Sequence, residues 1–225
     1  MMRYITAVAA LLISSCALDA GGAPGGTYVD PTAGGANCAE SLRPEFDRLR
    51  SKNWTASFEM PADDDWNKYW FLDGELATVS YQDDVLDFAA GPVAGDDSSH
   101  AVLWTRDSFT GDVMIEYDWT KLDAANGYVN ILYIQATGEP ALGYDEDILT
   151  WEDERRTPTM SLYFRRMNTL HISYSATRRD ERIGAYDYVR ARRYEPVKSL
   201  RLRGSDLSPD YFRVGLFHKP DETHK

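Results

Sequence analysis

A series of short segments rich in β-branched and aromatic residues runs through most of the chain and constrains its fold. Clusters of Gly, Asp, Asn and Pro, which favour turns, separate these segments. We predict strands over 69–72, 76–81, 113–119, 129–135, 160–166, 170–176, 186–194 and 211–217. Asp73-Gly74 predicts a hairpin between the first two strands, and 40–52 is the single predicted helix, with Pro44 in its first turn. Many short strands without a recurring helix indicate an all-β sandwich or jelly roll.

The N-terminal part has the composition of an export signal followed by a linker. Arg3 precedes an apolar run that is too short for a stable membrane span, and the run ends in Ile13-Ser-Ser-Cys16, which resembles a bacterial lipobox. We predict a signal peptide over 1–16 with lipidation of Cys16, a flexible Gly/Ala/Pro tether over 17–39, and a β-sandwich domain over 40–225. This organisation predicts an exported lipoprotein, periplasmic or on the cell surface, held at the membrane through its lipid anchor only.

Ordinary signal-peptide cleavage near Cys16 is the alternative to lipidation. The chain has two cysteines, so lipidation of Cys16 leaves Cys38 unpaired. Without lipidation, the two cysteines would be able to close a short disulfide loop in an oxidising compartment.

The positive charge is concentrated in one part of an acidic protein. Residues 155–203 contain thirteen basic and four acidic residues, a net charge of +9, whereas the whole chain carries −12. The rest therefore carries −21, which argues against general nucleic-acid binding. A cationic segment that is also rich in tyrosine favours an anionic ligand, and a solvated outer sheet face is the alternative interpretation.

The period of two in a strand sorts the side chains of 186–194 into two faces. One face is aromatic and cationic: Tyr186, Tyr188, Arg190, Arg192 and Tyr194. Tyrosine rings stack on sugars, and the guanidinium fork pairs with carboxylate or sulfate, so this face suits a groove for a charged glycan. An exposed convex face whose arginine stems lie along the surface is the other interpretation.

Several sequence blocks resemble a known family in the same order along the chain. They are Leu103–Trp119, Val129–Gly138, Met167–Tyr174, Asp187–Tyr194 and Asp210–Phe217, and they are similar to the YesU-like family of bacterial proteins. The resemblance implies a concanavalin A-like jelly-roll β-sandwich with a role in bacterial polysaccharide use. Family members continue for several strands after the last block, so the resemblance also implies a sandwich without its C-terminal strands or a shortened family member. An unpaired sheet edge of that kind would favour self-association.

A shorter similarity is found in the segment 211–217. It is similar to the Tyr-Phe-Lys-x-Gly-x-Tyr strand of jelly-roll alginate and glucuronan lyases, with Arg213 in place of the Lys and Phe217 in place of the second Tyr. The second replacement removes a hydroxyl that those enzymes use.

The first functional hypothesis is β-elimination on a uronic-acid polysaccharide. The reaction needs a cation or hydrogen-bond donor on the substrate carboxylate, a base for the C5 proton and an acid for the leaving oxygen. Candidate catalytic residues are His171, Tyr188 and Tyr186; candidate substrate-binding residues are Arg190, Arg192, Tyr194, Gln135 and Asn130. A histidine inside a strand is otherwise a hydrogen-bonded structural residue. Alternation places His171 on the face opposite Leu170, Ile172 and Tyr174.

Two further hypotheses remain. A non-catalytic glycan-binding lipoprotein needs only aromatic platforms and a few polar contacts. A glycoside hydrolase would use Glu116 and Asp118 as its acid and base, although Thr120 and Lys121 stand where concanavalin-like hydrolases have a further Glu. No cofactor is expected; the acidic runs 63–65, 83–84 and 145–147 carry oxygen ligands for a structural Ca²⁺, with solvated turns as the alternative.

Overall fold

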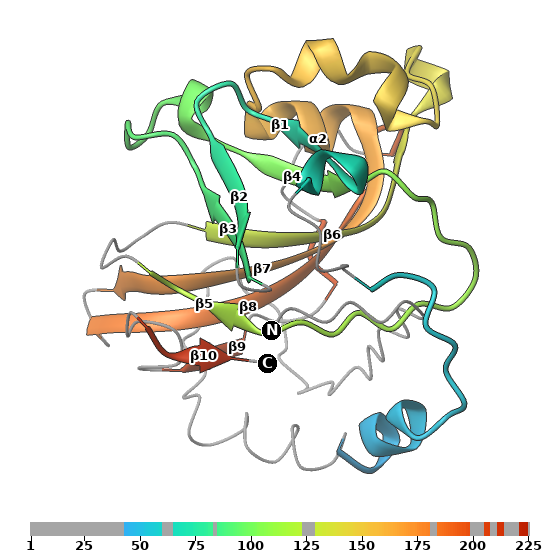
Figure 1. Cartoon of the computed structure of the whole chain (residues 1–225), viewed down its shortest axis with the longest axis vertical. Helices are drawn as coiled ribbons and strands as arrows, with labels where there is room; N and C mark the ends of the chain where they lie inside the picture. Colours follow the sequence, from blue (N-terminus) through green and yellow to red (C-terminus); the bar gives the residue numbers. More distant parts are fainter. Residues whose placement is uncertain are drawn as a thin grey trace, which may run out of the picture.

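The computed structural model describes residues 43–59, 65–82, 85–122, 129–180, 184–198, 205–207, 211–213 and 221–224 (Figure 1). The strands are β1 (Trp70–Asp73), β2 (Thr78–Gln82), β3 (Val85–Ala89), β4 (Val102–Thr105), β5 (Trp119–Thr120), β6 (Val129–Gly138), β7 (Met167–Asp180), β8 (Gly184–Tyr194), β9 (Tyr211–Arg213) and β10 (Thr223–His224). The helices are one over 43–50, the α-helix α2 (Met160–Arg166), and the 3₁₀ helices Trp66–Lys68, Asp97–Ser99, Pro140–Leu142 and Ile148–Arg155.

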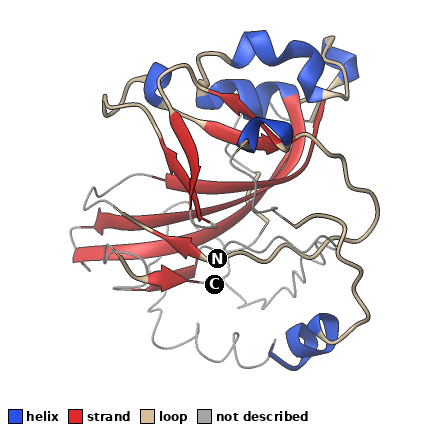
Figure 2. Cartoon of the chain, in the orientation of Figure 1, coloured by secondary structure: helices blue, strands red, loops and turns tan. Residues whose placement is uncertain are grey.

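The largest sheet is antiparallel and has the strand order β6-β7-β8-β9. Strands β6, β7 and β8 are long and curved, and they cross the middle of the molecule (Figure 2). Three two-stranded antiparallel sheets accompany it: β1 with β4, β2 with β3, and β5 with β10. The prediction of an antiparallel, strand-rich fold is therefore confirmed.

Both faces of the large sheet carry a layer of other elements. On one face, the indole of Trp104 in β4 stacks on the ring of Tyr133 in β6, with 5.4 Å between the ring centroids. On the other face, Trp119 in β5 meets Tyr174 in β7 edge to face at 5.3 Å. Because Tyr133 is paired with His171 in β7, His171 and Tyr174 of this strand face the two different layers, as the period of two requires.

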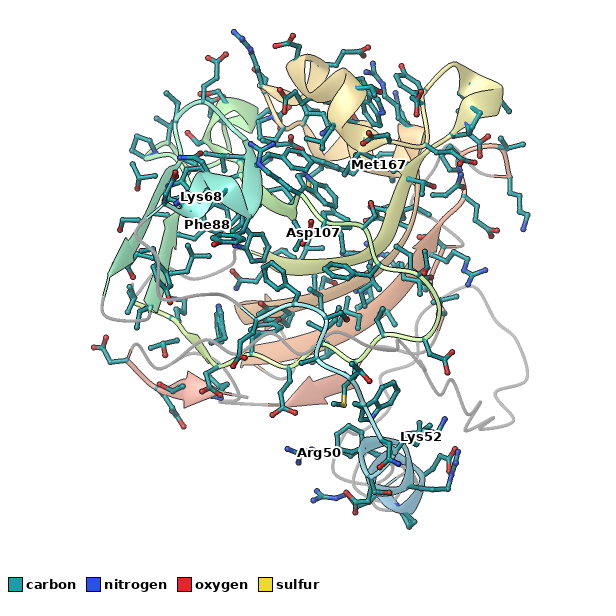
Figure 3. The ribbon with its side chains drawn as sticks, turned by 45° about the vertical axis from the view of Figure 1, so that its right-hand side comes forward. Arg50, Lys52, Lys68, Phe88, Asp107 and Met167 are labelled. Carbon is teal, nitrogen blue, oxygen red and sulfur yellow. The ribbon has the colours of Figure 1, made fainter. Side chains whose placement is uncertain are left out.

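The main core lies between the large sheet, β1–β4 and α2. Its buried members are Phe71, Trp104, Trp151, Tyr163, Met167 and Tyr194. A second cluster joins Phe58, Trp70 and Tyr81 near β2. Aromatic rings dominate both clusters, so geometry-dependent ring contacts add to the burial of apolar area. Figure 3 shows Met167, which is fully buried, where α2 joins β7.

A buried ion pair crosses the main core. The side chains of Asp73 in β1 and Arg155 are both 0% exposed, and Arg155 Nε donates to Asp73 Oδ2 at 2.7 Å. The same oxygen accepts from Trp104 Nε1 at 2.7 Å and from the Tyr163 hydroxyl at 3.1 Å. Burial raises the pKa of Asp73, although the Arg155 guanidinium and these donors act in the opposite direction.

The strand predicted over 160–166 is wrong, because this segment forms α2. Met160, Tyr163, Phe164 and Met167 all belong to or pack against the main core. Their spacing of three and four residues is that of one helix face. The composition is aromatic and suits a strand, but burial of this face and the Tyr163 bond to Asp73 favour the helix.

The hairpin predicted at Asp73-Gly74 is also wrong. Strands form on both sides of this turn, but β1 pairs with β4 and β2 pairs with β3. Gly74 has φ = +119°, and a Cβ atom there would lie 2.6 Å from the carbonyl oxygen of His100. Glycine at position 74 thus permits the chain to approach residues 100–101, which precede β4. It does not form the tight turn of a hairpin between β1 and β2.

Two other predicted elements are shorter in the structure. Of the strand predicted over 113–119, residues 113–118 are not in a strand, and β5 begins at Trp119. The predicted helix over 40–52 is present over 43–50, and Figure 3 shows Arg50 and Lys52 at its end, well away from the large sheet. Arg50 reaches back to Glu116, with 3.5 Å between Nη2 and Oε2.

The predicted signal peptide and tether, including Cys16 and Cys38, lie outside the described residues. In the part of the chain that is described, no helix combines the length and apolar character needed to cross a membrane.

Candidate functional site

A cavity of about 2140 Å³ lies against the large sheet. Side chains from three neighbouring strands, β6, β7 and β8, contribute polar groups to its wall: Tyr133, His171, Ser173, Arg190, Arg192 and Tyr194. Apolar residues of β3 and the following segment, including Phe88 and Val93, contribute another part of the wall and are about half exposed. The cavity thus combines an apolar side with a polar, cationic side, which is typical of a ligand site.

Strand register brings the polar residues together on one sheet face. His171 in β7 is paired with Tyr133 in β6 and with Arg192 in β8. One step along the same face, Ser173 is paired with Arg190, and in the other direction Thr169 is paired with Tyr194. Directly paired residues project to the same side of a sheet. The alternation predicted for Arg190, Arg192 and Tyr194 is therefore present, and His171 shares their face.

His171 lies between two tyrosine rings. Its ring centroid is 5.6 Å from that of Tyr133 and 5.0 Å from that of Tyr194, and the side chain is only 2% exposed. Within the described chain neither ring nitrogen has a hydrogen-bond partner. Burial, with help from the Arg192 and Arg190 charges, lowers the pKa of His171 to about 3. The imidazole is therefore neutral at ordinary pH.

The hydroxyl groups beside His171 are held in their protonated form. Burial raises the pKa of Tyr194 to about 12, although Arg192 acts against this rise. Burial also raises the pKa of Tyr133 well above its usual value, and the Tyr194 and Asp73 charges add to the effect. The hydroxyls of Tyr133 and Ser173 are buried and have no partner among the described residues. Such groups are uncommon in folded proteins and are candidates for contact with a ligand.

The two arginines share one carboxylate. Arg192 Nε donates to Asp206 Oδ1 at 2.7 Å, and Arg190 Nε lies 3.9 Å from the same oxygen. The side chains of Arg190 and Arg192 are 18% and 16% exposed, whereas Asp206 is 46% exposed. Two guanidinium groups thus lie beside the carboxylate of Asp206 on this side of the cavity.

Asp206 was missed by the sequence reasoning. Its segment was interpreted as a turn, but 205–207 lies along β8, where Arg193 N donates to Ser205 O and Leu207 N donates to Ala191 O, both at 2.9 Å. The bridge between Arg192 and Asp206 places the carboxylate on the arginine face. Three residues are too few for a period of two to be recognised, so no local signal pointed to this pairing.

The other predicted binding residues lie in different places. Gln135 lines the cavity; it has φ = +55° and sits at the bulge of β6 between Ile134 and Thr137. Asn130 also lines the cavity but is paired with Tyr174, so it projects from the face opposite His171. The backbone of Tyr186 and Tyr188 is in β8, but their side chains lie outside the described part.

The two carboxylates of the hydrolase hypothesis are not equivalent in the structure. Asp118 lines the cavity, whereas Glu116 forms the ion pair with Arg50. The strand predicted over 113–119 would place both on one face, but residues 113–118 do not form that strand. The structure therefore offers no strand geometry that would bring this pair to one sugar.

The acidic run 145–147 caps turns. Asp145 accepts from the backbone N–H of Asp147, and Asp147 accepts from that of Leu149. Across the described ranges, no group of three or more His, Cys, Asp or Glu side chains is arranged to hold a metal ion. The runs at 63–64 and 83–84 lie outside the described residues.

Comparison of the chain with protein-family models, curated protein sequences and solved structures found no significant match.

Proposed function

We propose that this protein binds an acidic polysaccharide in the cavity and cleaves it by β-elimination. The observation that carries the proposal is the arrangement of one neutral histidine, two protonated tyrosines and two arginines on one sheet face. This combination matches the needs of elimination from a uronic acid: cations for the carboxylate, and groups able to accept and donate a proton.

The proposed roles follow from charge and protonation. Arg190 and Arg192 bind the uronate carboxylate and stabilise the negative charge that develops on it when the C5 proton leaves. His171, which is neutral, accepts that proton. An approaching carboxylate raises the pKa of His171, which makes the imidazole a better base than it is in the unliganded site.

Tyr194 supplies the proton for the leaving group. The C5–H electron pair forms the double bond between C4 and C5, the bond from C4 to the glycosidic oxygen breaks, and that oxygen takes the phenolic proton. The high pKa of Tyr194 keeps this proton in place until the leaving oxygen develops negative charge. Neighbouring aromatic rings, such as Tyr133, provide flat surfaces for further sugar units.

The fold type and the cellular location are part of the same proposal. We infer a jelly-roll β-sandwich of the concanavalin A-like kind, exported and held at the membrane by a lipid on Cys16. The antiparallel sheet with a cavity against it and the lipobox-like sequence support these points.

A non-catalytic glycan-binding protein is the second candidate. One observation favours it: both ring nitrogens of His171 are buried, so a sugar reaches them only if neighbouring groups move. Binding alone would need the arginines and the aromatic surfaces and no movement of this kind.

The decisive experiment is incubation of the protein with a panel of uronic-acid polymers, namely polygalacturonate, alginate and glucuronan, with a neutral glucan as control. Elimination gives an unsaturated product that absorbs in the ultraviolet. New reducing ends without this absorbance would replace elimination by hydrolysis, and binding without any product would support the second candidate. Neither binding nor product across the panel would contradict the proposal.

A further inference from the structure

Asp206 does not line the cavity itself, but it contacts the two arginines that would bind the acid group of a ligand. Its Oδ1 atom is 2.7 Å from Arg192 Nε and 3.9 Å from Arg190 Nε, the two cations that line the cavity from β8. Its charge also acts on His171 and Tyr194, opposing the effect of the two arginines on each pKa. One carboxylate thus contacts both proposed binding arginines, and its charge acts on both residues to which proton transfer is assigned.

The contact between Asp206 and the arginines is of a kind that can be exchanged. The aspartate is nearly half exposed, and ion pairs open to water contribute little to stability because solvent competes for both partners. The backbone of 205–207 is held to β8 through the bonds at Ser205 and Leu207, so the side chain of Asp206 can rotate away while its segment stays in place.

We propose that Asp206 is an internal competitor for Arg190 and Arg192, and that the anionic group of a ligand in the cavity displaces it from these two arginines. The inference rests on the proposed binding of an acidic ligand at Arg190 and Arg192. It assigns a specificity role to Asp206, since only a ligand with its own anion compensates the arginines for the lost carboxylate. Neutral sugars leave Asp206 in position.

The test compares sulfate binding to the parent chain and to Asp206→Asn, measured by calorimetry at low ionic strength. The substitution keeps the side-chain shape and removes the competing charge, so sulfate affinity is expected to rise about fivefold. Asp153→Asn is the matched control, because Asp153 forms an exposed ion pair at 3.2 Å with Arg156, an arginine that does not line the cavity. It should bind sulfate as the parent does.

Two results would overturn the inference that Asp206 competes with the ligand. If Asp206→Asn binds sulfate no better than the parent, or more weakly, Asp206 positions the arginines and the inference is overturned. A gain of the same size in Asp153→Asn would also overturn it, because a general change in net charge would then explain the effect. Circular dichroism and the unfolding temperature confirm that each variant is folded.

The result is separable from the proposed function. Sulfate binding reports on the arginine position without any polysaccharide or reaction. A gain in Asp206→Asn together with a negative polymer panel would keep the competitor and remove the uronic-acid substrate. An active parent enzyme whose sulfate affinity is unchanged by the substitution would keep the reaction and remove the competitor.

Discussion

Asp73 and Arg155 form an ion pair that is closed to solvent, although 82 residues separate them in the sequence. Arg155 also donates to the carbonyl oxygens of Ile148 and Trp151, and its guanidinium lies over the Trp151 ring at 4.4 Å. The pair therefore joins β1 to the 3₁₀ helix Ile148–Arg155. Asp73 also accepts from Trp104, which lines the cavity.

Breaking this ion pair should destabilise the protein strongly. Arg155→Met leaves the Asp73 carboxylate buried without its cation, and we expect a loss of about 3–5 kcal/mol in the free energy of unfolding. Chemical denaturation followed by circular dichroism measures it. Arg156→Met is the neighbouring control: its side chain is 68% exposed in an ion pair with Asp153, and a change of about 0.5 kcal/mol or less is expected. Equal effects at both positions would contradict the structural role of the buried pair.

The stability of the protein should fall in acid because of His171. Its pKa is about 3 in the folded protein and 6.5 as a reference, so the unfolded chain binds a proton in this window and the folded chain does not. The contribution of His171 to the free energy of unfolding is fully present above pH 6.5. It is lost as pH falls towards 3, and the decrease is on the order of 4 kcal/mol. Asp73 has the opposite sign at the acid end, because its raised pKa favours proton uptake by the folded state.

Replacement of the imidazole isolates this effect. His171→Phe keeps an aromatic ring between the two tyrosines and should flatten the dependence of the unfolding free energy on pH between 6.5 and 3. His100→Gln is the control, because the side chain of His100 is 39% exposed, and it should keep the slope of the parent. A slope that survives in His171→Phe would show that other groups cause it.

Binding of an anionic glycan should depend on the arginines that face the cavity. Arg192→Gln and Arg190→Gln remove charges from the proposed site, and each should weaken binding of polygalacturonate about tenfold at low salt, with less effect at high salt. Arg193 directly follows Arg192, is exposed and points to the opposite face, so Arg193→Gln should bind like the parent. Affinity electrophoresis at two ionic strengths provides the measurement. Equal losses for the three variants would indicate only a general charge effect.

Gly138 should not tolerate a side chain. A Cβ atom there would lie 1.9 Å from the backbone oxygen of Asp145, and neither backbone segment is able to yield like a flexible side chain. Gly138→Ala should therefore lower the unfolding free energy by about 3 kcal/mol or more. Gly143→Ala, where φ is +87° but no atom lies within 4 Å, should cost only about 1 kcal/mol. Thermal unfolding of both variants compares steric overlap with backbone strain.

The parts of the fold that were predictable are those controlled by local pattern. The period of two in 186–194 placed Arg190, Arg192 and Tyr194 on one face, because a long paired strand leaves each side chain only two directions. The same rule separated His171 from Tyr174, which packs on Trp119 in the opposite layer. These statements need no knowledge of which strands are neighbours.

The parts that were not predictable depend on contacts between distant segments. Residues 160–166 form a helix because Tyr163 reaches Asp73, 90 positions away, and the helix spacing of the apolar residues was the available signal. The partner of β1 could not be read from Asp73-Gly74, because a turn signal does not say whether the next strand returns beside the first. Asp206 reaches the arginines through a short pairing with β8 that leaves no local pattern.

The stacking of Trp104 on Tyr133 has a practical consequence. Tyr133 in turn lies beside His171, so the indole is two ring contacts from the residue proposed to accept the substrate proton. Movement of the tyrosine ring changes the polarity and quenching around the indole. We therefore expect the fluorescence of Trp104, one of six tryptophans in the chain, to respond to ring movement in the cavity without an attached dye.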